Sequence, residues 1–238
     1  VKGTLNRPLE TGRSIPGVIR SSPGGVARNI AESLARLDLD VTLISAVGDD
    51  WTGLHLLEQV EQIGVNTTHV LVRPEIRTGT YLALYDQKQN LTGAMDDMAG
   101  LKAITPGYIH NRRRLFRDTR LVVIDANLSP RTLETIFRLA AEYDWPVCAD
   151  PTSTVLAPRL RPYLDRFRLL TPNLSEAQAL LGGGETYDQP LYLARRLVRR
   201  GVDLAVITLA ERGLCYATTD ESGRLPSVAV SIVDRTGV

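Results

Sequence analysis

Residues 41–65, VTLISAVGDDWTGLHLLEQVEQIGV, decide the class of fold. The first seven form an apolar run with the length of a buried strand, and the Gly and Asp residues that follow are typical of a turn. After the turn, apolar residues recur at intervals of three, at Leu54, Leu57, Val60 and Ile63. That spacing predicts one apolar face of a helix. A strand, a turn and a helix in this order are the repeating unit of layered α/β proteins.

The same alternation continues through the rest of the chain. Four more apolar runs are predicted as buried strands: Leu121–Asp125, Val147–Asp150, Arg168–Thr171 and Leu204–Thr208. Helical spacing is found in four other segments: Val26–Leu37, Pro130–Tyr143, Leu174–Leu181 and Gln189–Arg200. We therefore expect residues 1–238 to form one α/β domain, with a largely parallel sheet from Val41 onward covered by helices.

Two regions break the alternation. Residues 1–22 are rich in Gly, Pro and Ser, and residues 78–91 begin with the strand-like sequence TGTYLALYD. Short β elements outside a helix-covered sheet commonly form a flap or a dimer contact, although an edge hairpin is the simpler alternative. We expect these regions to form a small β appendage.

Composition and charge argue against several classes of protein. The 28 Lys and Arg residues nearly balance the 27 Asp and Glu residues, for a net charge of +1, which argues against nucleic-acid and membrane partners. The basic run Arg112–Arg114 is interpreted as a solvated helix face. Cys148 and Cys215 are expected to be buried thiols, and the three scattered histidines lack the spacing of a zinc site. Without an apolar run of about 18 residues or a signal peptide, a cytoplasmic location is expected.

Residues 22–29, SPGGVARN, join a diglycine turn to the first turn of a helix. Gly24 and Gly25 would let a ligand approach the backbone closely, and Asn29 can both donate to and accept from a sugar hydroxyl. This combination suits a polyol ligand. Gly-Gly before a helix is also an ordinary tight turn, so both interpretations stay open.

Polar residues follow several predicted strands, at the edge where open α/β sheets bind ligands. Asp50 is one candidate, and the alternative is that it caps the next helix. Asp125 and Asp150 end two other strands and suggest one crevice. In residues 173–176, NLSE, Asn173 and Glu176 fit a capping box, but the Glu176 carboxylate could instead hold a hydrated Mg²⁺.

Two glycine-containing segments remain. Residues 206–213, VITLAERG, end a strand in Thr208 and turn back after Gly213, so they could border a nucleotide or form a simple hairpin. Gly182–Gly184 follow a predicted helix and open none, which favours a helix C-cap and a linker over a phosphate loop.

In their order and spacing these motifs resemble the ribokinase-like (PfkB) carbohydrate kinases over essentially the whole chain. Gly24–Ala31 match the first signature of that family, Asn173 and Glu176 match its Asn-x-x-Glu motif, and Thr208–Gly213 match its Thr-Leu-Gly-x-x-Gly segment. Asp38 and Ala210 stand where the family usually has Gly. Within the family, pseudouridine kinases are most similar, on five segments: Ser14–Gly17, Ser22–Glu32, Asp97–Met98, Asp125–Leu128 and Asp150–Ser153.

The resemblance implies a three-layer αβα sandwich with a largely parallel sheet, and a β lid from residues 1–22 and 78–91 that also serves as a homodimer contact. It implies transfer of a phosphoryl group from ATP, with Mg²⁺, to a primary hydroxyl of a sugar or nucleoside, with pseudouridine as the first choice. Pseudouridine kinases typically carry Asn where Ile15 stands, which bears on the identity of the substrate. The implied roles are sugar or nucleoside binding for Gly24, Gly25, Asn29 and Asp50, nucleotide binding for Asn173, Thr208 and Gly213, and metal binding for Glu176.

The resemblance also implies two groups outside residues 1–238. A sugar-binding Asp on an initial strand would precede Val1, and the catalytic Asp would follow Val238, after the Asp-x-Thr-Gly pattern at residues 234–237. The alternatives are another sugar or nucleoside kinase of the same family, or a non-catalytic ligand-binding protein on the same fold. A Rossmann dehydrogenase is disfavoured, because no predicted strand is followed by GxGxxG.

Overall fold

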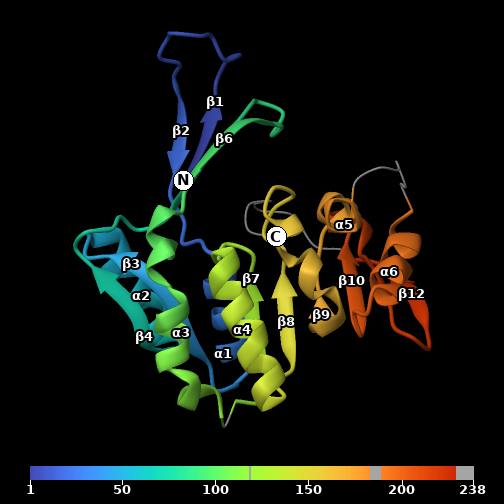
Figure 1. Ribbon diagram of the computed structural model, residues 1–238. Coiled ribbons are helices and arrows are strands. Elements are labelled where there is room, and N and C mark those ends of the chain that lie inside the picture. The colour runs from blue at the N-terminus through green and yellow to red at the C-terminus, as the bar shows by residue number, and fades with distance from the viewer. Residues whose placement is uncertain (118, 183–188, 229–238) are drawn as a thin grey trace. The chain divides into compact units, whose positions relative to one another are not determined.

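The computed structural model describes residues 1–117, 119–182 and 189–228 (Figure 1). The chain forms two compact units, Val1–Ile104 and Thr105–Val238, called here the first and the second unit. The strands belong to three sheets of four, six and two strands.

A two-stranded parallel sheet and two helices form the body of the first unit. The strands are β3 (Thr42–Gly48) and β4 (Asn66–Arg73), and the helices are α1 (Val26–Ala35) and α2 (Trp51–Gln62). Their shared core contains four fully buried residues, Ala31, Leu43, Val60 and Val65. A short 3₁₀ helix, η1 (Ala99–Ala103), also contacts β3.

The apolar face predicted for α2 is only partly correct. Val60 is 1% exposed, whereas Leu54 is 49% exposed. An interval of three residues falls about 60° short of a full helical turn, so each apolar residue lies further around the helix than the previous one. Leu54 and Ile63 therefore lie on opposite sides, and the regular spacing does not make a single buried face.

The two regions that break the α/β alternation do form a separate sheet of the first unit. Its strands are β1 (Lys2–Leu5), β2 (Gly17–Arg20), β5 (Thr80–Tyr85) and β6 (Leu91–Asp97), in the order β2-β1-β5-β6 (Figure 1). β1 pairs antiparallel with β2 and parallel with β5, and β5 and β6 form a hairpin. The β appendage extends to Asp97, and its roles as a lid and as a dimer contact stay predictions.

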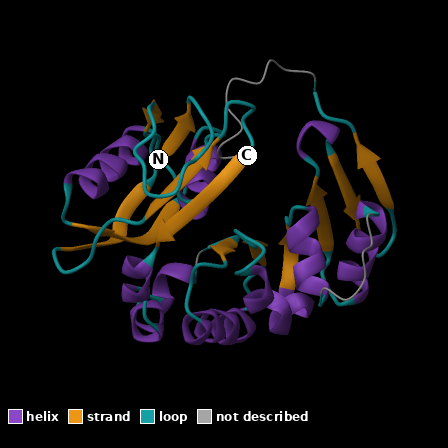
Figure 2. Cartoon of the chain, turned by 90° about the horizontal axis from the view of Figure 1, so that it is seen from above, coloured by secondary structure: helices purple, strands orange, loops and turns teal. Residues whose placement is uncertain are grey.

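A six-stranded sheet in the order β12-β11-β10-β9-β8-β7 is the centre of the second unit, and helices pack against it (Figure 2). β7 to β10 are parallel, and β11 and β12 extend the sheet antiparallel. The strands are β7 (Val122–Asp125), β8 (Val147–Asp150), β9 (Phe167–Leu170), β10 (Leu204–Thr208), β11 (Leu214–Ala217) and β12 (Ser222–Leu225). The α-helices are α3 (Pro106–Asn111), α4 (Pro130–Tyr143), α5 (Leu174–Leu181) and α6 (Pro190–Arg199), and the 3₁₀ helices are η2 (Arg113–Phe116), η3 (Ala157–Arg166) and η4 (Ala210–Arg212).

α4 shows why the helices of this unit were predictable. The Ser129 side chain accepts a hydrogen bond from the Thr132 N–H, and Pro130 occupies the first turn, where its missing N–H costs nothing. The buried side chains then recur at helical spacing, at Leu133, Ile136, Phe137 and Ala140. Both the start and the buried face of this helix are properties of its local sequence.

Most sequence predictions of elements are confirmed, with a few differences. All five predicted strands and all predicted helices are present within a few residues, but β4, α3 and β12 were not predicted, and β6 lies almost entirely beyond the predicted range 78–91. The basic run 112–114 does not form a solvated α-helix face: Arg113 and Arg114 lie in η2, and Arg112 and Arg113 are half-buried. Cys148 and Cys215 are buried free thiols, as expected. The parallel strands predicted as one sheet from Val41 onward belong to two sheets, and in the described ranges no helix is long and apolar enough to cross a membrane.

Candidate active site

The predicted diglycine loop lies at the N-terminus of α1. Gly25 is the N-cap residue, its φ of 100° favours glycine, and its carbonyl oxygen accepts a hydrogen bond from the Asn29 N–H at 2.8 Å. Gly24 differs, because a Cβ atom built on it would meet no atom within 4 Å beyond its chain neighbours. The space beside Gly24 is open, which suits close approach of a ligand. Three of the four residues predicted to bind the sugar, Gly24, Gly25 and Asn29, thus lie within one turn of a helix start.

Asp50 caps the next helix of the same unit. It is the N-cap of α2, and its carboxylate accepts hydrogen bonds from the Thr78 N–H at 3.0 Å, the Thr78 hydroxyl at 2.7 Å and the Gly53 N–H at 2.8 Å. These hydrogen bonds hold the pKa of Asp50 below its usual value, and the bond from the Thr78 N–H has the largest effect. Because three donors already occupy the carboxylate, the geometry favours capping, and substrate binding by Asp50 stays a prediction.

Replacing Asp50 by Ala is expected to lower the free energy of unfolding by about 2 kcal/mol, because the N-cap is lost and the Thr78 N–H loses its acceptor. This difference in the free energy of unfolding between the two proteins is expected to become smaller in acid. A carboxyl group with a depressed pKa contributes stability above the pKa of the unfolded chain, and that stability is lost as the pH falls through the folded value. Urea unfolding of both proteins between about pH 3 and pH 7 measures the difference. Unchanged stability together with weaker sugar binding would assign Asp50 to the substrate instead.

In the second unit, two acidic residues end adjacent parallel strands. Asp125 and Asp150 are register partners in β7 and β8, so the predicted grouping of acids at this edge of the sheet is confirmed for this pair. Burial raises the pKa of Asp150, and the charge of Asp125 raises it further. The carboxylate accepts a hydrogen bond from the Thr152 N–H at 2.7 Å and lies 3.4 Å from the Thr171 hydroxyl. In the described part of the chain, no basic side chain is among the groups that shift the pKa of Asp150.

Asn173 and Glu176 form the predicted capping box at the start of α5. The Asn173 side-chain oxygen accepts a hydrogen bond from the Glu176 N–H at 3.0 Å, and the Glu176 carboxylate accepts one from the Asn173 N–H at 2.9 Å. Glu176 is only 6% exposed, burial raises its pKa, and the charge of Asp150 raises it further. Capping alone does not require burial near a second carboxylate. The carboxylates of Glu176 and Asp150 therefore suit a bound cation, which would compensate their charge.

Thr208 lies directly beside Asn173. The two residues form a parallel β-bridge, and the Thr208 N–H donates a hydrogen bond to the Pro172 carbonyl oxygen at 3.0 Å. The end of β10 and the N-terminus of α5 are thereby held together. Two residues predicted to bind the nucleotide are neighbours, at the same end of the parallel strands as the acidic pair.

Gly213 closes the turn between β10 and β11, as the hairpin alternative predicts. Its carbonyl oxygen accepts a hydrogen bond from the Leu209 N–H at 2.8 Å, and its φ is 85°. A Cβ atom built on it would lie 2.0 Å from the Leu225 carbonyl oxygen. The backbone alone requires glycine here, so nucleotide binding by Gly213 stays a prediction. Gly182 is likewise the left-handed C-cap of α5, as predicted, and residues 183–184 lie outside the described residues.

Thr152 belongs to this edge of the sheet but was not predicted. Its φ of 67° is rare for a β-branched residue, and its hydroxyl accepts a hydrogen bond from the Ala126 N–H at 3.1 Å. The Thr152 N–H donates a hydrogen bond to the Asp150 carboxylate, so this strained residue connects the end of β8 to Ala126, the residue after β7. The dipeptide Asp150-Pro151 marked the place in the sequence, but nothing in the local pattern indicates a left-handed threonine.

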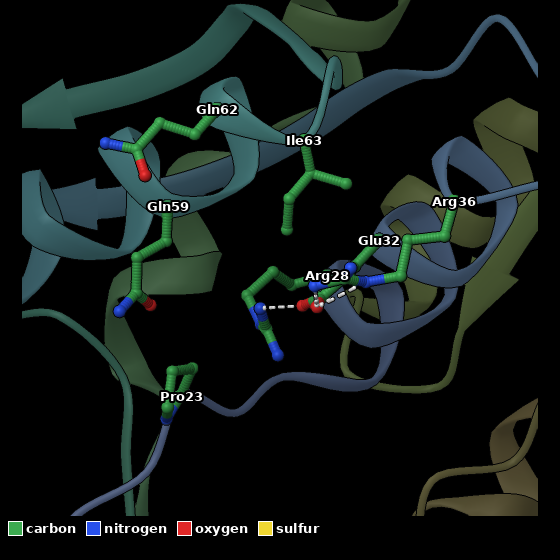
Figure 3. A pocket seen from close by; sticks show the side chains of 7 residues that line it. All are labelled: Pro23, Arg28, Glu32, Arg36, Gln59, Gln62 and Ile63. Carbon is green, nitrogen blue, oxygen red and sulfur yellow. Dashed lines mark hydrogen bonds and ion pairs between the residues drawn. The ribbon is translucent and has the colours of Figure 1, made fainter. Parts of the chain in front are cut away.

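Arg28, in the first unit, was also not predicted. Its Nε donates a hydrogen bond to the Gly24 carbonyl oxygen at 2.9 Å, and Nη1 donates one to Glu32 at 2.7 Å. The side chain borders a polar pocket of about 330 Å³ between α1 and α2 (Figure 3). The other residues of this pocket are Pro23, Glu32, Arg36, Gln59, Gln62 and Ile63. In the sequence, Arg28 and Glu32 look like an ordinary surface ion pair of a helix.

Comparison with known proteins identifies the family. Residues 8–238 match the description of the pfkB family carbohydrate kinases. The chain belongs to this family. It is 33% identical to the pseudouridine kinase of Escherichia coli (strain K12), covering the whole chain and 76% of that protein, and 28% identical to the guanosine-inosine kinase of Exiguobacterium acetylicum, covering the whole chain and 79% of that protein. The chain spans 66% to 79% of the length of three curated relatives that match all of it.

Solved structures of a carbohydrate kinase and a ribokinase confirm the predicted ribokinase-like α/β fold. The carbohydrate kinase from Agrobacterium tumefaciens is 27% identical, with a TM-score of 0.78 over 93% of this chain and 70% of that chain. Arabidopsis thaliana ribokinase, solved in complex with ribose and ATP, is 19% identical, with a TM-score of 0.81 over 99% of this chain and 77% of that chain.

The two departures from the pfkB glycine pattern lie at left-handed backbone positions. Asp38 follows α1 with a φ of 59°, and Ala210 begins η4 with a φ of 51°. A residue with a Cβ atom is strained in this conformation, and glycine is not. The departure at Asp38 therefore concerns the end of a helix, as expected from the sequence.

Ala210 and Gly213 allow a matched pair of substitutions in one turn. Ala210→Gly is expected to stabilise the protein, raising the free energy of unfolding by about 0.5 kcal/mol. Glycine relieves the backbone strain at the left-handed position, and this gain exceeds the cost of the greater conformational entropy that glycine gives the unfolded chain. Gly213→Ala is expected to cost about 2 kcal/mol or more, because it adds strain and a clash with the Leu225 carbonyl oxygen. Urea unfolding of the three proteins tests both signs. A stable Gly213→Ala variant with weakened ATP binding would assign Gly213 to the nucleotide.

The acidic residues of the second unit fit Mg²⁺. Among the described residues, no three His, Cys, Asp or Glu side chains are arranged to hold a metal ion by themselves. Mg²⁺ does not need such a cage, because it keeps several waters and is usually held by one or two carboxylates together with substrate phosphates. Glu176 and Asp150 supply carboxylates of that kind.

Proposed function

We propose that this protein transfers the γ-phosphoryl group of ATP to a primary hydroxyl of a nucleoside or sugar, with pseudouridine as the preferred acceptor. The observation that carries the proposal is the buried Glu176 carboxylate, which has Asp150 as a like-charged neighbour and lies in a helix turn joined to Thr208. A buried and a half-buried acid that have no basic partner among the described residues, beside a helix N-terminus, suit a magnesium-bound phosphate chain. The pfkB relatives supply the reaction class, and the Escherichia coli relative suggests the acceptor.

The first unit would bind the acceptor. Gly24 leaves open space beside the backbone, and the Asn29 amide can form hydrogen bonds with a hydroxyl group. Phosphoryl transfer needs little covalent chemistry from a protein, so holding the acceptor hydroxyl in place is a large part of catalysis.

The second unit would bind the nucleotide and the metal. Glu176 and Asp150 would hold Mg²⁺ through its waters, and Asn173 and Thr208 would border the phosphates. When bound, Mg²⁺ neutralises charge on the phosphate oxygens. The N-terminus of α5 adds a favourable field for anions.

The test is an acceptor screen with the full-length protein, ATP and Mg²⁺. ADP release is measured for pseudouridine, uridine, inosine, guanosine, ribose and deoxyribose, and the product is checked by mass spectrometry for one added phosphoryl group. We expect the highest kcat/KM with pseudouridine. Guanosine and inosine are the second choice, because the guanosine-inosine kinase matches the whole chain. Acceptor binding measured by calorimetry without ADP release would instead support a non-catalytic ligand-binding protein.

A further inference from the structure

The Arg28 side chain is held by acceptors on three sides. Nε donates to the Gly24 carbonyl oxygen, Nη1 donates to the Glu32 carboxylate, and Nη2 donates to the Asn29 side-chain oxygen Oδ1. The side chain is 15% exposed. Figure 3 shows the guanidinium group beside Glu32 in the pocket between α1 and α2. Arg28 thus joins the diglycine loop to the amide predicted to bind the sugar.

The contact with Arg28 determines which way the Asn29 amide faces. A guanidinium group has only hydrogen-bond donors, so the amide atom facing it must be the oxygen. The reversed amide would place its NH₂ group against the N–H groups of Arg28. In the described part of the chain, the Asn29 Nδ2 group has no hydrogen-bond partner of its own, so it is available to a ligand as a donor.

Glu32, the carboxylate partner of Arg28, also pairs with Arg36. Glu32 accepts hydrogen bonds from Arg36 Nε at 3.1 Å and Nη2 at 2.9 Å, while its other oxygen faces Arg28. The hydrogen bond from Arg36, and then the contact with Arg28, hold the pKa of Glu32 below its usual value, so Glu32 stays ionised at neutral pH. The Arg36 side chain is 62% exposed, and exposed ion pairs contribute little to stability. Arg28, unlike Arg36, also contacts Gly24 and Asn29, so orientation of those groups is a better account of Arg28 than a contribution to folding.

We propose that Arg28 is a positioning residue for the acceptor, acting through Asn29. This inference rests on the proposed function. Arg28 holds the Asn29 amide so that Nδ2 donates a hydrogen bond to the oxygen of an acceptor hydroxyl. The proton of that hydroxyl is then free for a different acceptor group, whereas a reversed amide would accept that proton through its own oxygen. Arg28 also holds the Gly24 carbonyl oxygen, which keeps the loop beside the substrate in one conformation.

A double-mutant cycle on Arg28 and Asn29 tests the proposal, with the best acceptor from the screen. Arg28→Ala and Asn29→Ala are each expected to raise KM for the acceptor about tenfold, with kcat and KM for ATP little changed. The double variant is expected to stay within about twofold of Asn29→Ala, because Arg28 acts through Asn29. Arg28→Lys is expected to raise KM for the acceptor by less than Arg28→Ala does. One ammonium group cannot reach both the Gly24 carbonyl oxygen and Asn29 Oδ1.

Arg36→Ala is the matched control, because Arg36 shares Glu32 with Arg28 but has no described contact with Gly24 or Asn29. It is expected to leave KM for the acceptor within about twofold of the wild-type value. Melting temperatures identify any variant that is simply unfolded, and Glu32→Gln, which loosens Arg28 without touching Asn29, then replaces Arg28→Ala in the cycle.

Three results separate the inference from the proposed function. A double variant with KM raised about a hundredfold, the product of two independent effects, overturns the positioning role while the kinase function stands. An Arg36→Ala variant whose KM for the acceptor rises as much as that of Arg28→Ala also overturns the positioning role. It would show that Arg28 matters only as a member of the ion pairs on α1. A wild-type protein that neither phosphorylates nor binds any acceptor overturns the proposed function and the inference with it.

Discussion

Glu176→Gln is expected to lower kcat by about 100-fold or more while the protein stays folded. Glutamine keeps a side-chain oxygen that can accept the hydrogen bond from the Asn173 N–H, so the capping box survives. It removes the negative charge, and the loss of a charge that holds Mg²⁺ at the phosphates is worth several kcal/mol in the transition state. The Mg²⁺ concentration needed for half-maximal rate is expected to rise in parallel.

Steady-state rates over a range of Mg²⁺ concentrations, together with thermal unfolding, distinguish catalysis from capping at this residue. Glu142→Gln is a suitable control, because it makes the same chemical change on the exposed surface of α4. A Glu176→Gln variant that is stable, active and unchanged in its Mg²⁺ dependence would leave Glu176 a structural cap. A large fall in melting temperature would show that the charge itself supports the fold.

Asp150→Asn is expected to stabilise the protein while lowering turnover by about tenfold or more. The Asp150 carboxylate is half-buried near two other acids, so its ionised form raises the free energy of the folded state. Asparagine can keep the hydrogen bond from the Thr152 N–H and can donate to the Thr171 hydroxyl. Without Mg²⁺, Tm is expected to rise at pH 8 by the ~2–4 °C that corresponds to ~1 kcal/mol in a chain of this length.

The pH dependence gives the sign of this effect. Because the pKa of Asp150 is raised in the folded protein, its contribution to stability is greatest below the pKa of the unfolded chain and is lost as the pH rises through the folded value. Asparagine does not titrate, so the gain in Tm is expected to be smallest near pH 4 and to grow toward pH 8. Thermal unfolding at several pH values checks this. A variant less stable than the wild type at pH 8 would show that a positive group compensates Asp150 in the native protein.

Much of the fold was predictable because helices carry their signals locally. α4 and α5 begin and end at the predicted residues, since caps and apolar spacing within a dozen residues define them. β4 was not predicted, because its polar and apolar residues do not alternate cleanly. It is a strand because it pairs with β3, and that partner lies outside its own sequence.

The candidate site divides in the same way. The sequence by itself determined the capping box of Asn173 and Glu176 and the capping alternative for Asp50, because each involves residues three positions apart in one helical turn. Only the tertiary structure decided that Glu176 is buried near Asp150 and that Thr208 bridges to Asn173. The physical reason is that the pKa of a carboxyl group depends on burial and on charges nearby in space, and these are set by how distant strands pair and pack.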